Sequence, residues 1–185
     1  MRIISGIARG TKLYTLEGTN TRPTLDRIKE PLFSIIQNKI KNAIVLDLFS
    51  GSGALALESL SRGAQKAILC DSSPKAIEVI KKNIVKTHFE NQTQIICKDY
   101  KKCLKSINEK FDLIFIDPPY EENIAVDAVN IVINKELLSE NGLVILETDN
   151  EERELDQIKN LKNNIKICDL RSYGRVKLIF LNREG

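Results

Sequence analysis

The sequence is poor in the side chains that bind metals or form cross-links. It has one histidine, His88, no tryptophan and four cysteines, none of them in a CxxC pair. Without clustered ligands we expect no metal site, and we place His88 on the surface or in the last turn of a helix. The cysteines stand among apolar residues in strand-like or helical stretches. We therefore expect a reducing, cytoplasmic location.

Long hydrophobic runs are absent as well. No apolar run approaches the ~18 residues of a membrane span, and residues 1–6 are too short in apolar length for a signal peptide. Hydrophobic residues make up 42% and charged residues 29% of the 185-residue chain, which is an ordinary globular mixture. We expect a single domain over residues 1–185, monomeric and without a membrane anchor.

The net charge is small, but the charged residues are unevenly placed. The net charge is +3, yet residues 1–29 carry +4 and the remainder −1. A basic surplus at one end favours contact with a polyanion there. A solvated basic face is the alternative, and the charge alone does not separate the two. The basic residues of this segment are Arg2, Arg9, Lys12, Arg22, Arg27 and Lys29.

Apolar runs and helical patterns alternate from residue 43 onward. The runs occupy residues 43–49, 66–71, 93–99, 111–117 and 142–148. This alternation predicts an α/β fold with a parallel sheet covered by helices on both faces. Two further runs, "NIKICDLRSYG" and "RVKLIFLN", have too short a connection to be parallel. The sheet should therefore have seven strands and end in an antiparallel hairpin.

The first forty residues follow a different pattern. "MRIISG" and "TKLYTL" are predicted to pair as a small β-hairpin outside the main sheet. A helix through "RIKEPLFSIIQNKI" should begin at Thr24 or Asp26, with Pro31 marking a kink or a later start. We divide the domain into residues 1–40 and a core of residues 41–185.

A glycine loop follows the first predicted strand. Gly51, Gly53 and Ala56 match the G-x-G-x-x-G/A pattern, and Asp71 ends the next strand 20 residues after Gly51. Such glycines let the backbone approach a ligand closely, and the later acid accepts hydrogen bonds from ribose. The pattern predicts a site for an adenosine-containing cofactor. A tight strand-to-helix turn without a ligand is the alternative.

Asp47 and Asp99 refine the choice of cofactor. Asp47 precedes the glycines, where its carboxylate would repel a pyrophosphate but favour the ammonium and sulfonium of S-adenosylmethionine. Asp99, followed by Tyr100, is placed to accept from an adenine amino group, or else it caps the next helix. We expect S-adenosylmethionine as the cofactor.

The stretch Asp117-Pro118-Pro119-Tyr120 ends the fourth predicted strand, at the edge where ligands bind in such sheets. Prolines lack a backbone N–H and stiffen the corner. A rigid corner that offers only acceptors suits an exocyclic amino group, and Tyr120 offers a ring on which a base can stack. The corner predicts transfer of a methyl group to a base amine by in-line displacement. A plain strand-ending turn is the alternative.

With "DLFSGSG" and "DPPY", the chain resembles class I methyltransferases that modify exocyclic amino groups. "MRIISGIARGTKL", "TRPTLDRIKEPLFSII" and "DLFSGSGALALESLSRGA" resemble the RsmD family of 16S ribosomal RNA guanine-N2 methyltransferases. The resemblance extends over nearly the whole chain, to the terminal "GRVKLIFL". It implies a Rossmann-like fold, S-adenosylmethionine as cofactor and 16S ribosomal RNA as partner. The small basic surplus suggests a partly assembled small ribosomal subunit as the substrate.

The resemblance also implies roles for individual residues. The cofactor would be bound by Asp47, Phe49, Ser50, Gly51, Gly53, Asp71, Ser72, Asp99 and Tyr100. The target guanine would be held by Asp117, Pro118, Pro119 and Tyr120. RNA would be contacted by Arg2, Arg9, Lys12, Arg22, Thr24 and Arg27. Asp26 would cap a helix or pair with an arginine rather than act in catalysis. The chain departs from the family pattern at Asp71, where a glutamate is expected, and at Pro31.

Three other functions share some of these features. A DNA adenine-N6 methyltransferase also uses an Asp-Pro-Pro-Tyr corner, but 185 residues leave no room for a target-recognition insert. A nicotinamide-dependent oxidoreductase would account for the glycines and Asp71, but for neither Asp47 nor residues 117–120. A catalytically silent RNA-binding module is disfavoured because both the cofactor and the target motifs are intact.

Overall fold

A computed structural model describes residues 1–16, 23–119, 124–161 and 165–183 of the chain, and the side chains of residues 23–27 lie outside that description. Arg22 and Tyr120 fall outside the described residues, as do the side chains of Thr24, Asp26 and Arg27.

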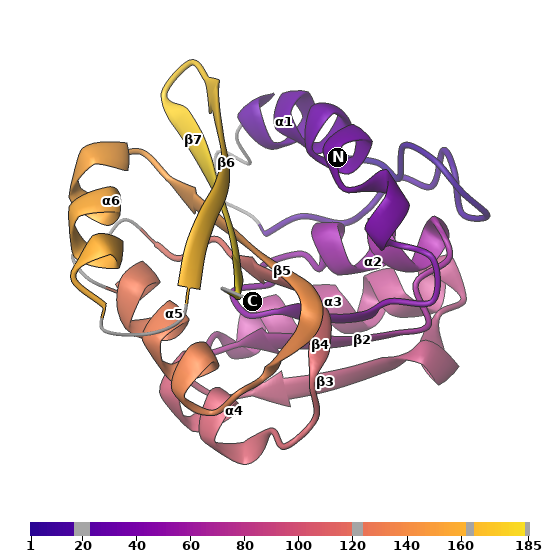
Figure 1. Ribbon diagram of the computed structural model, residues 1–185. Helices are drawn as coiled ribbons and strands as arrows, with labels where there is room; N and C mark the ends of the chain where they lie inside the picture. Colours follow the sequence, from indigo (N-terminus) through magenta and orange to yellow (C-terminus); the bar gives the residue numbers. More distant parts are fainter. Residues whose placement is uncertain (17–22, 120–123, 162–164, 184–185) are drawn as a thin grey trace.

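Seven strands form one sheet in the order β3-β2-β1-β4-β5-β7-β6 (Figure 1). The strands are β1 (Ile44–Asp47), β2 (Lys66–Asp71), β3 (Thr93–Cys97), β4 (Phe111–Ile116), β5 (Leu138–Thr148), β6 (Ile165–Tyr173) and β7 (Val176–Arg183). Strands β1 to β5 are parallel to one another, whereas β7 is antiparallel to both β5 and β6. The predicted parallel sheet with a final antiparallel hairpin is confirmed.

Helices cover both faces of this sheet, as its apolar strands require. One core lies under α1 (Pro23–Ile35), α2 (Ala54–Ser61) and α3 (Pro74–Thr87). The other lies under α4 (Tyr100–Ser106), α5 (Ile124–Asn134) and α6 (Glu151–Lys159). Alternate residues of β7 supply the two cores: Leu178 and Phe180 face the first, and Ile179 and Leu181 face the second. Strand β7 therefore contributes buried side chains to the cores on both faces of the sheet.

Two elements, β5 and α6, differ from the sequence-based prediction. β5 begins at Leu138, four residues before the predicted start, because Leu138 pairs with Phe111 ahead of a register shift. Helix α6 was not predicted, although Asn150 caps it by accepting from the Arg153 N–H at 3.2 Å. The sequence signal for α6 was an Asn followed by three acidic residues in the first turn.

Helix α1 begins at Pro23, one residue before the earliest predicted start, and Pro31 lies inside it. Proline at the first helical position is favourable because its missing N–H has no partner there in any helix. Ile28, Leu32 and Phe33 are buried in the first core, so tertiary packing outweighs the helix-breaking tendency of Pro31.

The predicted N-terminal hairpin is reduced to one antiparallel bridge between Arg2 and Lys12. The Ile3 N–H donates to the Thr11 carbonyl at 3.0 Å, but the intervening residues form turns rather than strands. Ile3 is fully buried. We call residues 1–16 the N-terminal segment. A few backbone hydrogen bonds join its two ends, and side chains of the core domain bind it at further points.

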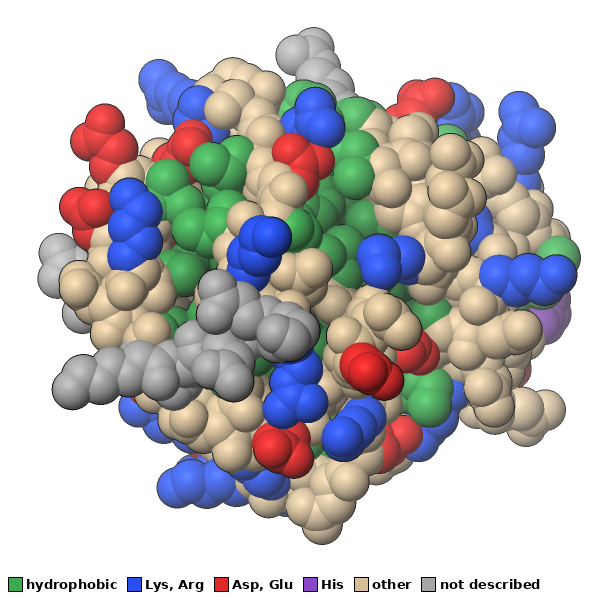
Figure 2. Space-filling view, in the orientation of Figure 1, with side chains coloured by type: hydrophobic (Ala, Val, Ile, Leu, Met, Phe, Trp, Pro, Cys, Tyr) green, Lys and Arg blue, Asp and Glu red, His purple; other side chains and the backbone are tan. Residues whose placement is uncertain are grey.

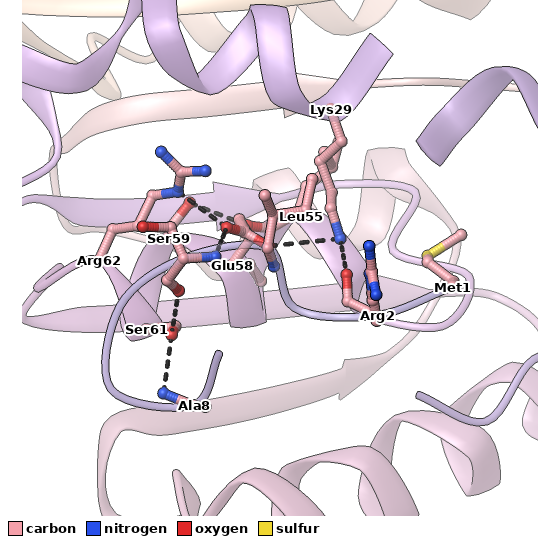
Figure 3. A network of polar contacts seen from close by, with 12 residues as sticks. Met1, Arg2, Ala8, Lys29, Leu55, Glu58, Ser59, Ser61 and Arg62 are labelled. Atoms are coloured by element: carbon pink, nitrogen blue, oxygen red, sulfur yellow. Dashed lines mark hydrogen bonds and ion pairs between the residues drawn. The ribbon is translucent and has the colours of Figure 1, made fainter. Parts of the chain in front are cut away.

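Glu58 of α2 is the main tether of the N-terminal segment (Figure 3). Its Oε2 accepts from the Ile4 N–H at 2.8 Å and lies 3.3 Å from Lys29 Nζ. Its Oε1 accepts from the Ser5 N–H at 3.0 Å and from Arg62 Nε at 2.8 Å. The side chains of Glu58 and Lys29 are completely buried. Lys29 Nζ also donates to the Arg2 carbonyl, and a buried ion pair is tolerated when such additional hydrogen bonds satisfy it.

Within the part of the chain that the structure describes, no helix combines the length and the apolar character that crossing a membrane would require.

Candidate active site

The functional residues gather where the strand order reverses. The chain passes from β1 outward through β2 to β3, and then returns to place β4 on the other side of β1. In open α/β sheets, ligands bind at the carboxyl ends of the strands at such a switch point. Asp47, Asp71 and Asp117 lie at or directly after the carboxyl ends of β1, β2 and β4. The fold therefore brings together three carboxylates that are far apart in the sequence.

The glycine loop has the conformation that its sequence predicts. Gly51 and Gly53 have φ angles of +55° and +79°. A Cβ at Gly53 would come within 2.8 Å of Leu69 Cδ2, whereas a Cβ at Gly51 would have no neighbour within 4 Å. Gly53 thus packs against the sheet, and Gly51 leaves open space in front of the loop. Ser50 Oγ closes the turn by donating to the Asp47 carbonyl at 2.6 Å.

Asp71 anchors this loop in addition to its expected role toward ribose. Its Oδ2 accepts from the Gly51 N–H at 2.9 Å, and its Oδ1 accepts from the Ser73 N–H at 2.8 Å. The carboxylate thus joins the loop after β1 to the start of α3. Its contact with ribose remains a prediction.

Asp47 is almost entirely buried, with 3% of its surface exposed. Its Oδ2 accepts from the Ala56 N–H at 3.3 Å. Burial and, to a smaller extent, the nearby carboxylates of Asp117 and Asp71 together raise the pKa of Asp47 to about 7, against the lowering effect of the Ala56 N–H. This arrangement concentrates negative potential beside the glycine loop. A cation bound there would relieve that repulsion.

Tyr100 forms one wall of the site. Its ring centroid lies 5.6 Å from that of Phe49, with a tilt of 42° between the rings. Its hydroxyl donates to Asp127 Oδ2 at 2.7 Å. Partial burial raises the pKa of Tyr100, and so does this hydrogen bond. The phenol is therefore fixed as a neutral donor, and its ring orientation is set from α5. Asp127 was not predicted from the sequence, which gives no signal for a contact between α4 and α5.

Asp99 caps helix α4, which was the structural alternative given for it. Its Oδ1 accepts from the Lys102 N–H at 3.0 Å, and this bond lowers its pKa. Asp99 does not line the pocket described next. A contact with adenine remains a prediction, and the cap alone is sufficient to account for the residue.

A pocket of about 360 Å³ joins the predicted cofactor and target residues. Its lining residues are Leu48, Phe49, Asp71, Ser72, Lys98, Tyr100, Asp117, Pro119 and Ile124. Asp117 and Pro118 are half-buried and Pro119 is exposed, so the corner after β4 faces the pocket with its acid inward. The sequence analysis did not predict Lys98 as a site residue. It follows β3 directly, and a lone lysine there gives no sign of a pocket.

A second pocket, of about 490 Å³, is lined by Met1, Arg2, Ile4, Lys12, Leu13 and Glu30. The bridge between Arg2 and Lys12 brings these two predicted RNA contacts together, whereas Arg9 lies on an exposed turn away from this pocket. Lys29 is completely buried against Glu58, so its charge is neutralised inside the protein. On the face in Figure 2, Lys and Arg side chains alternate with Asp and Glu around a hydrophobic patch.

Comparisons with known proteins match both sequence and fold. A family model described as "Conserved hypothetical protein 95" matches residues 1–182. Ribosomal RNA small subunit methyltransferase D from Haemophilus influenzae is 36% identical over 80% of this chain and 79% of its own. The protein of the same name from Escherichia coli (strain K12) is 31% identical over 80% of this chain and 75% of its own.

The fold comparison agrees. The solved structure of yhhF from Escherichia coli has a TM-score of 0.88 and 28% identity, and the match covers 100% of this chain and 98% of that one. The seven-stranded sheet is the Rossmann-like sheet of class I methyltransferases, as expected. The family match spans both the N-terminal segment and the core. The chain is therefore a member of the family described as Conserved hypothetical protein 95, the RsmD family, which includes ribosomal RNA small subunit methyltransferase D.

Proposed function

We propose that this protein transfers a methyl group from S-adenosylmethionine to the exocyclic N2 of a guanine in 16S ribosomal RNA. The observation that carries this proposal is the single pocket shared by Asp71, Tyr100 and Asp117 at the switch point of the sheet. The residues that we assign to the cofactor and to the target base line the same cavity, which supports the proposal. The names of the relatives support ribosomal RNA over DNA as the substrate.

The residues present fit the cofactor. The open space at Gly51 admits close approach of a ligand to the loop, and the acids at positions 47, 71 and 117 favour a cation. Asp71 and Ser72 are suited to the ribose, and the Phe49 and Tyr100 rings to the flat adenine. A dinucleotide would instead bring a negatively charged pyrophosphate toward Asp47. Burial already disfavours the charged carboxylate of Asp47, and a second negative charge beside it would disfavour it further.

The corner after β4 is suited to the target base. Asp117 and the carbonyl groups of the proline pair accept hydrogen bonds, and the prolines donate none. An exocyclic amine is a weak nucleophile because its lone pair is delocalised into the ring. Hydrogen bonds from both of its N–H groups to fixed acceptors aim that lone pair along one line. Tyr120 is proposed to stack on the base.

The chemistry needs alignment more than acid or base strength. Bound S-adenosylmethionine supplies a methyl group on a positively charged sulfur atom. The guanine nitrogen would form the new N–C bond as the S–C bond breaks, which would release S-adenosylhomocysteine, and the amine would then lose a proton. The protein holds the two reactants in line and excludes water, which lowers the entropy barrier of the reaction.

Methyl transfer from isotopically labelled S-adenosylmethionine tests the proposal. The substrates are naked 16S ribosomal RNA, small-subunit particles and adenine-containing duplex DNA, and the product nucleoside is identified by mass spectrometry. We expect N2-methylguanosine, formed faster on particles than on naked RNA. N6-methyladenine in DNA would refute the proposal, and equal rates on the two RNA substrates would refute a preference for particles.

The Asp117→Asn variant tests the role of the corner. It should lower kcat about 100-fold, since a fixed group that acts in the transition state contributes roughly that factor. The Kd for S-adenosylhomocysteine should change little. Glu109→Gln is the matched control, because Glu109 forms a surface ion pair with Lys66 at 2.8 Å, outside the pocket residues. Equal kcat values for the two variants would remove Asp117 from the mechanism.

A further inference from the structure

Asn83 is a buried polar residue that neither the cofactor nor the target site explains. It lies on α3 and has no exposed surface. Its Oδ1 accepts from the Tyr14 N–H at 2.7 Å, and its Nδ2 donates to the Tyr14 carbonyl at 2.9 Å. The second Nδ2 proton goes to the Ser52 carbonyl, also at 2.9 Å. Both donors and the acceptor of the amide are therefore used, which no other side chain of this size can reproduce.

The partners of Asn83 belong to two different parts of the protein. Tyr14 lies in the N-terminal segment, which carries Arg2 and Lys12. Ser52 lies between the two glycines of the cofactor loop. Asp71 holds this loop on one side through the Gly51 N–H at 2.9 Å, and Asn83 holds it on the other.

Two further contacts strengthen the connection. Ser52 Oγ lies 3.7 Å from the Met1 sulfur, so the N-terminal segment also meets the loop directly. Lys86, one turn beyond Asn83 on α3, places its Nζ 4.3 Å from the centroid of the Tyr14 ring. The position of Tyr14 is thus fixed by α3 through both its main chain and its ring.

Besides Glu58, Ser61 also holds the segment, from the far end of α2. Ser61 Oγ donates to the Ser5 carbonyl at 2.6 Å and accepts from the Ala8 N–H at 3.0 Å. Helix α2 begins at the glycine loop and ends at Ser61, so Ser61 holds the segment without touching the loop. Ser61 therefore provides a control that separates docking of the segment from positioning of the loop.

We propose that Asn83 is a positioning residue that couples the N-terminal segment to the cofactor loop. This inference rests on the proposed function, in which the segment contacts RNA and the loop binds S-adenosylmethionine. RNA that restrains Tyr14 also restrains Ser52, and the loop then loses less freedom when the cofactor binds. By linkage, the cofactor strengthens RNA binding by the same factor.

The test compares wild type, Asn83→Ala and Ser61→Ala. Calorimetry measures the Kd for S-adenosylhomocysteine with and without a saturating 16S ribosomal RNA transcript. In wild type and Ser61→Ala, RNA should tighten S-adenosylhomocysteine binding. In Asn83→Ala, the Kd should rise about tenfold, the typical effect of one buried hydrogen bond, and RNA should no longer change it. An Asn83→Ala variant that keeps the wild-type Kd and RNA effect would overturn the inference.

Hydrogen exchange in the wild-type protein tests the same inference without a substitution that could impair folding. S-adenosylhomocysteine should slow exchange of the Tyr14 N–H, which Asn83 accepts, and leave that of the Ala8 N–H unchanged. If S-adenosylhomocysteine binds but Tyr14 exchanges at an unaltered rate, this inference fails and the proposed function stands. If S-adenosylhomocysteine does not bind the wild type at all, both fail.

Discussion

Asp47 makes stability depend on pH. Its pKa of about 7 in the folded protein exceeds its ordinary value of 3.8, because burial disfavours the charged carboxylate. A carboxyl group with a raised folded-state pKa takes stability away as pH rises from the unfolded value to the folded one. The destabilisation therefore develops between about pH 4 and pH 7 and is complete above that window, at roughly 4 kcal/mol or less.

Asp47→Asn should remove this dependence, since its amide oxygen can still accept the Ala56 N–H. The measurement is the free energy of unfolding by urea between pH 4 and pH 8. We expect the variant to gain stability relative to wild type as pH rises, because other groups titrate alike in both proteins. A difference that stays constant with pH would show that the carboxylate of Asp47 is not destabilised by burial.

At the level of single residues, the sequence predicts which side chains gather at the site, but it does not predict the contacts that hold them in place. Spacing located Asp47, Asp71 and Asp117, because the carboxyl ends of neighbouring parallel strands share one edge. The anchoring of the glycine loop by Asp71 and Asn83 could not be predicted. Both depend on side chains from α3 and β2 meeting a loop that is distant in the chain, and such pairings leave no periodic signal.

The two glycines of the loop should respond differently to substitution. Gly53→Ala combines a φ of +79° with a 2.8 Å approach to Leu69 Cδ2. It should lower the free energy of unfolding by about 1–2 kcal/mol. Gly51→Ala meets no atom within 4 Å, so its loss of stability should be smaller, while its methyl group should obstruct the cofactor. Thermal unfolding and the Kd for S-adenosylhomocysteine provide the comparison. The opposite ranking would contradict this account of the loop.

Among elements, the strands and helices of the core were predictable because burial on both faces leaves uninterrupted apolar runs. The N-terminal hairpin is confirmed only as a short antiparallel pairing around Arg2 and Lys12, because the side chains of Glu58, Ser61 and Asn83 take up other backbone groups of the segment. Alternation of apolar residues does not distinguish an extended segment held by side chains from a paired strand. The amphipathic α6 was missed because its mean character is polar and only Glu154 and Ile158 are buried.

For the whole molecule, the tether at Glu58 indicates that the N-terminal segment and the core unfold together. Glu58→Ala removes a buried carboxylate that pairs with Lys29, which should cost about 3–5 kcal/mol. Calorimetry should show one transition, shifted down in temperature, in the variant as in wild type. Glu78→Ala is the control, because Glu78 pairs with Lys81 at the surface and its loss should change stability by less than about 0.5 kcal/mol. A separate early transition would indicate an independently folding segment.

The position of β7 between β5 and β6 sets the order in which the molecule can be completed during synthesis. The ribosome produces β6 before β7, yet β6 pairs with β7 and β7 with β5. Until the final strand emerges, the apolar β5 presents an open edge, and β6 has no neighbour on which to add. A nascent chain stalled before residue 176 would therefore expose an unpaired, aggregation-prone strand edge that chaperones and other nascent chains can bind.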